Sequence, residues 1–137
     1  MMNNQDIRWQ QRLSHYLKAF ELLNSAIAIK NPSIVERAGL IQFFEMAFEL
    51  AWKLLKDYLE AEGYTIKSPR DAIKQAFQSG IIIEGHQWMA ALEDRNLTTH
   101  TYNETTALAV EQSIRHKYYP LLEQLQLTFK RYETDLP

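Results

Sequence analysis

The sequence has no cysteine, and its first residues, MMNNQDIRWQQ, contain no apolar block. Disulfide bonds require cysteine and a secretory signal requires such a block, so nothing in the chain points to an oxidising compartment. We therefore expect a cytoplasmic protein. Long uninterrupted apolar runs are missing as well, because the most apolar segment, LIQFFEMAFELAWKLL at residues 40–55, contains Glu45, Glu49 and Lys53. Charges at these positions are costly in a bilayer, so the segment is predicted to be a core helix and not a membrane span.

Glycine, histidine and serine are too scattered for several kinds of active site. The four glycines, at positions 39, 63, 80 and 85, form no loop that could cradle phosphates, which argues against nucleotide hydrolysis. The histidines, at 15, 86, 100 and 116, form no pair three or four residues apart, so we predict no metal site and no cofactor. The serines lack the glycine elbow of a hydrolase nucleophile. A net charge of -2 gives no global attraction to nucleic acid, so any contact with RNA must rest on a local patch.

What remains is the composition of a helical domain. With 137 residues, 46% of them hydrophobic, the chain can bury a core without disulfides or metal, and we expect one domain over residues 1–137. Apolar side chains recur at every third or fourth position, and no alternating pattern is flanked by turn residues. The predicted helices cover about 6–29, 33–63, 68–80, 84–96 and 103 to near the C-terminus. The predicted fold class is all-α.

Local signals predict where most of these helices begin and end. Ser33 and Ser68 are expected N-caps, the second followed by Pro69 at the first helical position. Gly63 suits the left-handed position that follows the second helix. Pro120 should kink the last helix, because its ring removes a backbone N–H and clashes with the preceding turn.

The second predicted helix has an unusually wide apolar face. On a wheel of about 100° per residue, its polar side chains fall within roughly a third of the circumference. An outer helix of a monomeric bundle needs a narrower buried face, so this helix is either central or covered by a second subunit. We favour a homodimer, and the alternative is that the short helices of the same chain cover the face.

The segment DRNLTTHTYNE, residues 94–104, breaks the helical pattern and gathers distinctive chemistry. Four residues separate Arg95 from His100, and Tyr102 follows two positions later. Arginine can donate a planar fork to a phosphate and stabilise transition-state charge, while neutral histidine can take the proton from a ribose 2′-hydroxyl. These groups suit metal-independent cleavage of RNA. The structural alternative is that residues 94–96 end one helix, His100 bonds a neighbouring carbonyl and Asn103 caps the next helix.

The arrangement of Arg95, Asn96, His100 and Tyr102 resembles the signature of the HEPN superfamily, Arg, four residues, His, one residue, Tyr. More specifically, the chain resembles the nucleotidyltransferase substrate-binding proteins, the HEPN partners of minimal nucleotidyltransferases. The similar segments are 43–63, 68–77 and 81–104, so the resemblance covers nearly the whole chain. It implies an up-and-down four-helix bundle with an additional short helix. It also implies a homodimer in which the arginine and histidine of each subunit line a cleft near the interface.

The resemblance carries two versions of the function. In the first, the chain is a ribonuclease toxin with Arg95 and His100 as catalytic residues and Asn96 in support. An antitoxin nucleotidyltransferase neutralises it and can transfer adenylate to Tyr102. In the second, the chain is a non-catalytic subunit that binds substrate for a nucleotidyltransferase. The side chains favour catalysis, because a phosphate-binding pocket would use lysine or arginine more than imidazole. A purely structural dimerisation domain would leave Arg95 and His100 unexplained.

Two tryptophans and a charge run have plainer interpretations than RNA binding. Trp52 and Trp88 could stack on bases, but they lie among apolar helical positions, and we expect both in the core. Residues 115–117, Arg-His-Lys, could extend an RNA groove, but a charge run on a long helix is usually a solvated face.

The polar side chains of the second helix allow two interpretations. Glu45, Glu49 and Lys53 fit an ordinary ladder of neighbours along a helix. Facing a cleft, the same stripe would orient Arg95. The sequence leaves both possibilities open.

Overall fold

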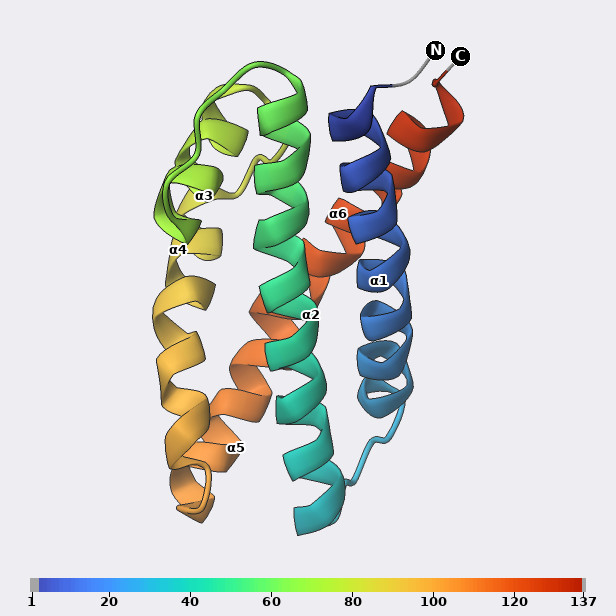
Figure 1. Ribbon diagram of the computed structural model, residues 1–137. Helices are drawn as coiled ribbons and strands as arrows, with labels where there is room; N and C mark the ends of the chain where they lie inside the picture. The colour runs from blue at the N-terminus through green and yellow to red at the C-terminus, as the bar shows by residue number, and fades with distance from the viewer. Residues whose placement is uncertain (1–2, 137) are drawn as a thin grey trace.

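The computed structural model describes residues 3–136, with Leu97 and Thr98 described by their backbone alone. Every regular element in this range is helical, which confirms the all-α prediction (Figure 1). The elements are α1 (Asn4–Ile27), α2 (Ile34–Ala61), α3 (Pro69–Gln78), α4 (Gly85–Asp94), the 3₁₀ helix η1 (Arg95–His100), α5 (Glu104–Ser113), the π-helical turn η2 (Ile114–Tyr118) and α6 (Tyr119–Thr134).

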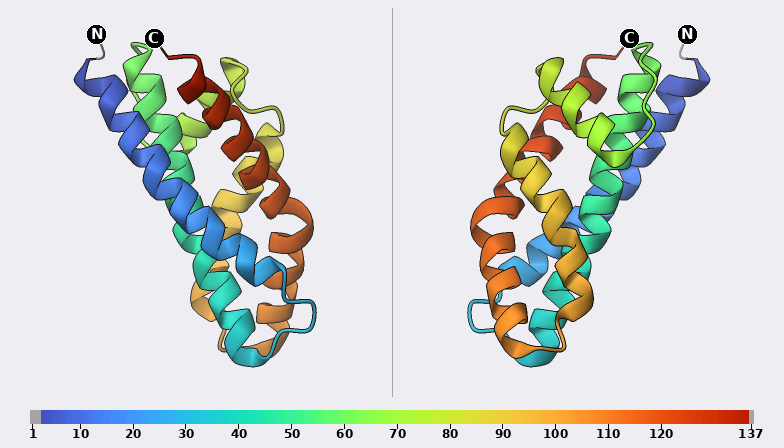
Figure 2. Two further views of the ribbon diagram at one scale, coloured as in Figure 1. Left: turned by 90° about the vertical axis from the view of Figure 1, so that its right-hand side faces the viewer. Right: turned by 90° about the vertical axis from the view of Figure 1, so that its left-hand side faces the viewer.

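The helices form an up-and-down bundle around α2. The long helices α1 and α2 run antiparallel, α4 returns along α2, and α5, η2 and α6 form one continuous rod behind it (Figures 1 and 2). The short α3 packs on α2 and α4. The predicted four-helix bundle with an additional short helix is therefore confirmed.

Local sequence signals set the helix ends as expected. The Ser33 hydroxyl accepts the backbone N–H of Glu36, whose carboxylate accepts the Ser33 N–H, so the two form a complete capping box. The Ser68 hydroxyl accepts the backbone N–H of Asp71 and so caps α3, with Pro69 at the first position of that helix. Gly63 has a φ of 101°, a backbone conformation that favours glycine. The predicted caps and the glycine position are confirmed.

Pro120 disturbs the helical stretch formed by α5, η2 and α6, as predicted. The disturbance is a widened turn just before the proline. Proline at position 120 has no N–H to continue the regular hydrogen-bond ladder. Just before it, the backbone N–H of Tyr119 bonds the carbonyl of Ile114, five residues back, and residues 114–118 form the π-helical turn. Such turns are rare and occur often at functional sites. Here the turn sets the direction of Tyr118, which contacts the end of α4.

The hydrophobic core runs the length of the bundle and contains large aromatic side chains. Trp9, Trp88, Phe44, Phe48 and Phe129 are all buried to within 2% of full burial. The prediction for Trp88 is thus confirmed. Trp52 is only half-buried at the edge of this core, so the prediction that it is a core residue is wrong in part. Its indole N–H donates to Glu49 at 3.0 Å, and a polar partner holds it at the surface.

The wide apolar face of α2 is covered largely within the same chain. This helix contacts α1, α3, α5, α6 and η1, and its buried residues lie on several of its sides. It is the central helix of the bundle, one of the two explanations that the sequence allowed. The homodimer stays a prediction. Within residues 3–136, no helix is both long and apolar enough to cross a bilayer.

Candidate functional site

An open hollow of about 600 Å³ lies where η1 meets the middle of α2. Arg95 both caps the C-terminus of α4 and begins η1, so the motif segment starts at this junction. The hollow is lined by Gln42, Glu45, Met46, Glu49, Arg95, Asn96 and Thr99. Of the four motif residues, the structure therefore brings Arg95 and Asn96 to one concave surface.

Glu49 holds Arg95 in place on the wall of the hollow. Its Oε2 accepts a hydrogen bond from Arg95 Nη1 at 3.0 Å and another from Trp52 Nε1 at 3.0 Å. Its Oε1 lies 3.6 Å from Lys53 Nζ. Both interpretations of the polar stripe are thus correct for Glu49, which forms a helical ladder with Lys53 and orients Arg95. The Arg95 side chain stays 28% exposed, within reach of solvent and ligand.

A buried tyrosine anchors the residue that precedes Arg95. The Tyr118 hydroxyl donates to Asp94 Oδ2, and the Tyr118 ring stacks on Phe44 at 5.7 Å between ring centres. Burial raises the pKa of the Tyr118 phenol well above its ordinary value, and the hydrogen bond to Asp94 raises it further. The phenol therefore remains a donor at neutral pH and ties the end of α4 to η2. Sequence patterns do not reveal this contact, because its two partners lie 24 residues apart.

His100 and Tyr102 lie at the far end of the motif segment and face solvent. His100 ends η1, is exposed, and is not among the residues that line the hollow. Its ring meets that of Tyr102 edge-on, with centres 6.3 Å apart. Tyr102 is 87% exposed. The structure of one chain thus separates the motif into two parts, Arg95 and Asn96 in the hollow, and His100 and Tyr102 on the adjoining surface.

The motif segment also has the capping role that the structural alternative required. The Asn103 side chain accepts the backbone N–H of Thr106 at 3.2 Å, which caps α5. The Asn103 N–H in turn donates to the carbonyl of His100 at 3.2 Å. Capping and chemistry are therefore compatible, since the capping contacts use the backbone of His100 and leave its imidazole exposed.

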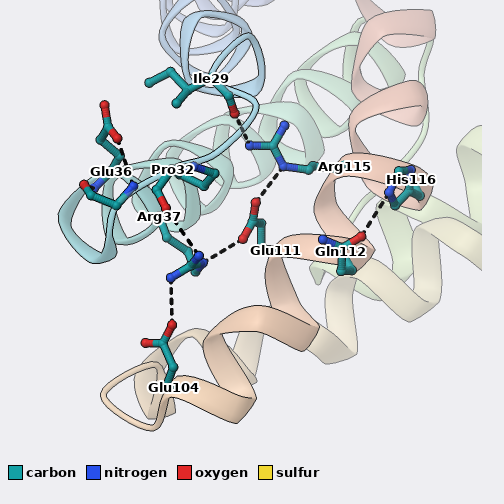
Figure 3. A network of polar contacts seen from close by, with 10 residues as sticks. Ile29, Pro32, Glu36, Arg37, Glu104, Glu111, Gln112, Arg115 and His116 are labelled. Atoms are coloured by element: carbon teal, nitrogen blue, oxygen red, sulfur yellow. Dashed lines mark hydrogen bonds and ion pairs between the residues drawn. The ribbon is translucent and has the colours of Figure 1, made fainter.

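Beside this region, two arginines share one buried carboxylate (Figure 3). Glu111 Oε1 accepts a hydrogen bond from Arg37 Nε, and Glu111 Oε2 accepts one from Arg115 Nε, each at 2.7 Å. Arg115 also donates to the backbone carbonyls of Ile27 at 2.8 Å and Ile29 at 2.7 Å. Burial on its own would raise the pKa of the Glu111 carboxyl, but the hydrogen bonds from Arg37 and Arg115 outweigh it and lower the pKa.

This network corrects the prediction for the charge run at residues 115–117. Arg115 is mostly buried, 15% exposed, because Glu111 and the carbonyls at the end of α1 and in the following loop lie within its reach. His116 and Lys117 are exposed, as expected of a solvated face. The His116 ring contacts Gln112 at 3.0 Å, one helical turn away.

Metal ligands do not gather anywhere in residues 3–136 to the extent that a metal centre needs. In this range no three side chains of His, Cys, Asp or Glu converge on one point. The predicted absence of a metal and of a cofactor stays a prediction.

Comparison with known proteins adds the family. A family model described as nucleotidyltransferase substrate binding protein like matches residues 11–131, a range that includes all four motif residues. The chain belongs to this family. It is thereby a member of the HEPN superfamily, as its motif indicated.

Two known proteins are similar to this chain, one by its sequence and one by its sequence and its structure. A Haemophilus influenzae protein named probable ribonuclease HepT is 34% identical over 91 residues, 61% of this chain and 62% of that protein. The match thus spans less than two thirds of the relative's length. A crystal structure of a protein from Thermus thermophilus is 37% identical, with a TM-score of 0.76 over 85% of this chain and 97% of the other. The helical architecture of this family is therefore shared across most of the chain.

The sequence identifies the motif and offers one of its supports, because a polar stripe that includes Glu49 could orient Arg95. It does not indicate the other support. Asp94 lies inside the motif segment, yet its partner Tyr118 lies 24 residues away. Within the stripe, no pattern distinguishes Glu49 from Glu45. A carboxylate on the central helix at the level of the motif arginine is the one signal that could have singled out Glu49.

Proposed function

We propose that this protein is a metal-independent HEPN-type endoribonuclease, the toxin of a toxin–antitoxin pair, which a minimal nucleotidyltransferase neutralises in the cytoplasm. One observation carries the proposal. Arg95 is held by Glu49 on the wall of an open hollow, beside Asn96 and on the same short 3₁₀ helix as an exposed histidine, His100. The name of the Haemophilus influenzae relative, probable ribonuclease HepT, supports the same chemistry.

The proposed reaction uses the RNA's own 2′-hydroxyl. Neutral His100 takes the proton from this hydroxyl, and the 2′-oxygen attacks the adjacent phosphorus. The bond from phosphorus to the 5′-oxygen breaks, leaving a 2′,3′-cyclic phosphate and a free 5′-hydroxyl once that oxygen is protonated. Arg95 stabilises the added negative charge on the phosphate oxygens, and Asn96 donates from the same wall. The protein contributes only proton transfers and electrostatic contacts to this exchange of one P–O bond for another, so the proposed reaction uses no metal.

The proposed active form is a homodimer. In one chain, Arg95 faces the hollow while His100 lies on the adjoining surface, outside the lining of that hollow. A second copy packed along this face would bring another Arg95 and another His100 to the same cleft. The phosphate would then lie among two arginines and two imidazoles, with one imidazole to accept a proton and the other to donate it.

Replacing His100 tests the reaction most simply. We expect the wild-type protein to cleave single-stranded RNA in the presence of EDTA and to leave 2′,3′-cyclic phosphate ends. His100→Ala should lower the cleavage rate by at least about 100-fold, the usual contribution of a general base. His116→Ala is the matched control, because it removes an exposed histidine on η2 that bonds only Gln112. Equal cleavage by the two variants would rule out the catalytic role of His100.

Tyr102 is the proposed site where the partner acts. Its phenol is 87% exposed, and another enzyme's active site can reach it without unfolding the bundle. Transfer of adenylate from ATP to this oxygen, with release of pyrophosphate, would add a negatively charged phosphodiester close to His100. That group would occupy the place of an RNA phosphate and put negative charge beside the imidazole that has to accept a proton. Either effect blocks cleavage.

Intact mass spectrometry tests the modification. Incubation with the cognate nucleotidyltransferase, ATP and Mg²⁺ should add one or more adenylate masses to the wild-type chain and abolish cleavage. Tyr102→Phe should gain no such mass and remain active. Tyr64→Phe is the control, because Tyr64 is also exposed, at 43%. Inhibition of the wild type without any added mass would show that the partner acts by covering the cleft.

The second candidate function is a non-catalytic subunit that presents substrate to a nucleotidyltransferase. The family description favours it, since it names substrate binding and no reaction. The two candidates share the partner and differ in what His100 does. A protein that binds the nucleotidyltransferase tightly but leaves RNA intact would favour this second candidate.

A further inference from the structure

Both ends of the motif segment are tied to the same helix, α2. At the start of the segment, Arg95 bonds Glu49 of α2. At its end, Glu104, which is also the first residue of α5, accepts a hydrogen bond from Arg37 of α2 at 2.8 Å. Residues 37 and 49 lie about 18 Å apart along a helix that rises 1.5 Å per residue. One rigid helix thus spaces the two ends of the segment.

A short chain of contacts links Arg37 to the position of His100. Glu104 is fixed by Arg37, and its neighbour Asn103 caps the same turn through Thr106. The Asn103 N–H donates to the carbonyl of His100 at 3.2 Å. The His100 side chain is exposed, and its ring meets the exposed ring of Tyr102 edge-on. The place of His100 therefore depends on the first turn of α5 more than on packing of its own ring.

Arg37 is itself held rigidly, which makes it suitable as a fixed point. Its side chain is 12% exposed, Nε bonds Glu111 at 2.7 Å, and Nη2 bonds the carbonyl of Pro32 at 3.4 Å. The second arginine on Glu111, Arg115, joins the same carboxylate to the α1–α2 loop (Figure 3). The guanidinium that reaches Glu104 is thus anchored by two further contacts, with Glu111 and with the carbonyl of Pro32.

We propose that Arg37 is a positioning residue, which through Glu104 fixes His100 relative to Arg95 with α2 as the common base. The consequence for cleavage rests on the proposed function, whereas the fixed geometry does not. Glu104 is 52% exposed, and an ion pair so open to water adds little to stability. The contact between Arg37 and Glu104 should therefore affect the order of the motif segment and leave folding stability nearly unchanged.

The test uses Glu104→Ala, Arg37→Lys and the double variant of the full chain. Lysine retains a charge for buried Glu111 but lacks the fork that reaches Glu104 at the same time. In the absence of RNA, NMR order parameters of the amides at 99–103 should fall in each variant. With RNA, kcat should fall on the order of tenfold with KM within about twofold, because misplacement of a catalytic group affects the chemical step. The double variant should be no worse than either single one, since both break the same link.

Thr105→Ala is the matched control, because Thr105 lies on the same exposed turn of α5. It should change neither the order parameters nor kcat. Unchanged order parameters in Glu104→Ala would overturn the inference whatever the activity. So would an unchanged kcat in a variant of an RNA-cleaving wild type, or multiplied losses in the double variant. If the wild type cleaves no RNA, the proposed function fails, and the order parameters alone decide the inference. If Arg37→Lys fails to fold, Glu104→Ala carries the test.

Discussion

Two arginines pair with carboxylates of α2 in nearly the same geometry and yet serve different purposes. Arg12 Nε lies 2.9 Å from Asp57, and Arg95 Nη1 lies 3.0 Å from Glu49. The arginine side chains are similarly accessible, 31% and 28% exposed. The carboxylates differ, because Asp57 is 4% exposed and Glu49 is 40% exposed.

Burial of the carboxylate decides what each pair does. A buried carboxylate without its cation is strongly destabilising, so Arg12 is required for folding stability. A carboxylate that water can reach loses little when its partner is removed, so the pair of Glu49 with Arg95 contributes little to stability. What it provides is orientation of a guanidinium in a hollow. The contact between arginine and carboxylate is thus similar in both places. The burial of the carboxylate distinguishes a pair that stabilises the fold from a pair that orients a functional side chain.

The largest expected effect lies in Glu111, the buried carboxylate that two arginines share. Glu111→Gln leaves Arg37 and Arg115 without a counter-charge in a buried place, which should cost about 3–5 kcal/mol in the free energy of unfolding. Urea unfolding at neutral pH measures the difference. Glu133→Gln is the control, because Glu133 is exposed near the end of α6. A loss below about 1 kcal/mol in unfolding free energy would contradict this prediction, because Glu111 would then contribute no more than an exposed carboxylate.

The effect of Glu111→Gln on the free energy of unfolding should depend on pH. The pKa of Glu111 is lowered in the folded protein from its ordinary value of 4.5, so its stabilisation is complete above that value. As the pH falls through the lowered folded pKa, the carboxyl gains its proton and the stabilisation disappears. The difference in unfolding free energy between wild type and Glu111→Gln should therefore shrink in acid. A constant difference from pH 7 to the acid limit of folding would contradict the assignment.

A smaller effect is expected for the exposed carboxylate that orients Arg95. Glu49→Gln keeps a hydrogen-bond acceptor but loses the charge, so Arg95 should be less firmly oriented. We expect kcat for RNA cleavage to fall about tenfold, with an unfolding free energy within about 1 kcal/mol of the wild type. Glu60→Gln, another acid of α2 outside the hollow, is the control. If Glu49→Gln is strongly destabilised but cleaves RNA at the wild-type rate, the pair of Glu49 with Arg95 stabilises the fold and does not orient a catalytic group.

The sequence predicted those features of the fold that depend on near neighbours. Ser33 with Glu36, and Asn103 with Thr106, are capping pairs three residues apart, and the helical periodicity is equally local. Arg115 was misjudged, because its carbonyl partners lie 86 and 88 residues earlier in the chain. No local pattern reveals such a contact.

The candidate site likewise has residues that the sequence identifies and supporting residues that it does not. Its four motif residues all lie within residues 95–102 and can be identified from spacing and resemblance. The supports come from elsewhere, since Glu49 lies 46 residues before Arg95 and Tyr118 lies 24 residues after Asp94. Trp52 was expected in the core because its position is apolar on the helical wheel, and the bond to Glu49 keeps it at the edge.

The most direct test of the central claim measures two properties of two variants, Arg95→Ala and Arg12→Ala. Urea unfolding gives stability, and cleavage of single-stranded RNA in EDTA, at a temperature where both variants are folded, gives activity. Arg95→Ala should lose at least about 100-fold in cleavage rate and less than about 1 kcal/mol in stability. Arg12→Ala should lose about 2–4 kcal/mol in stability and retain cleavage within about twofold. Cleavage that survives in Arg95→Ala, or that falls equally in both variants, would contradict the account.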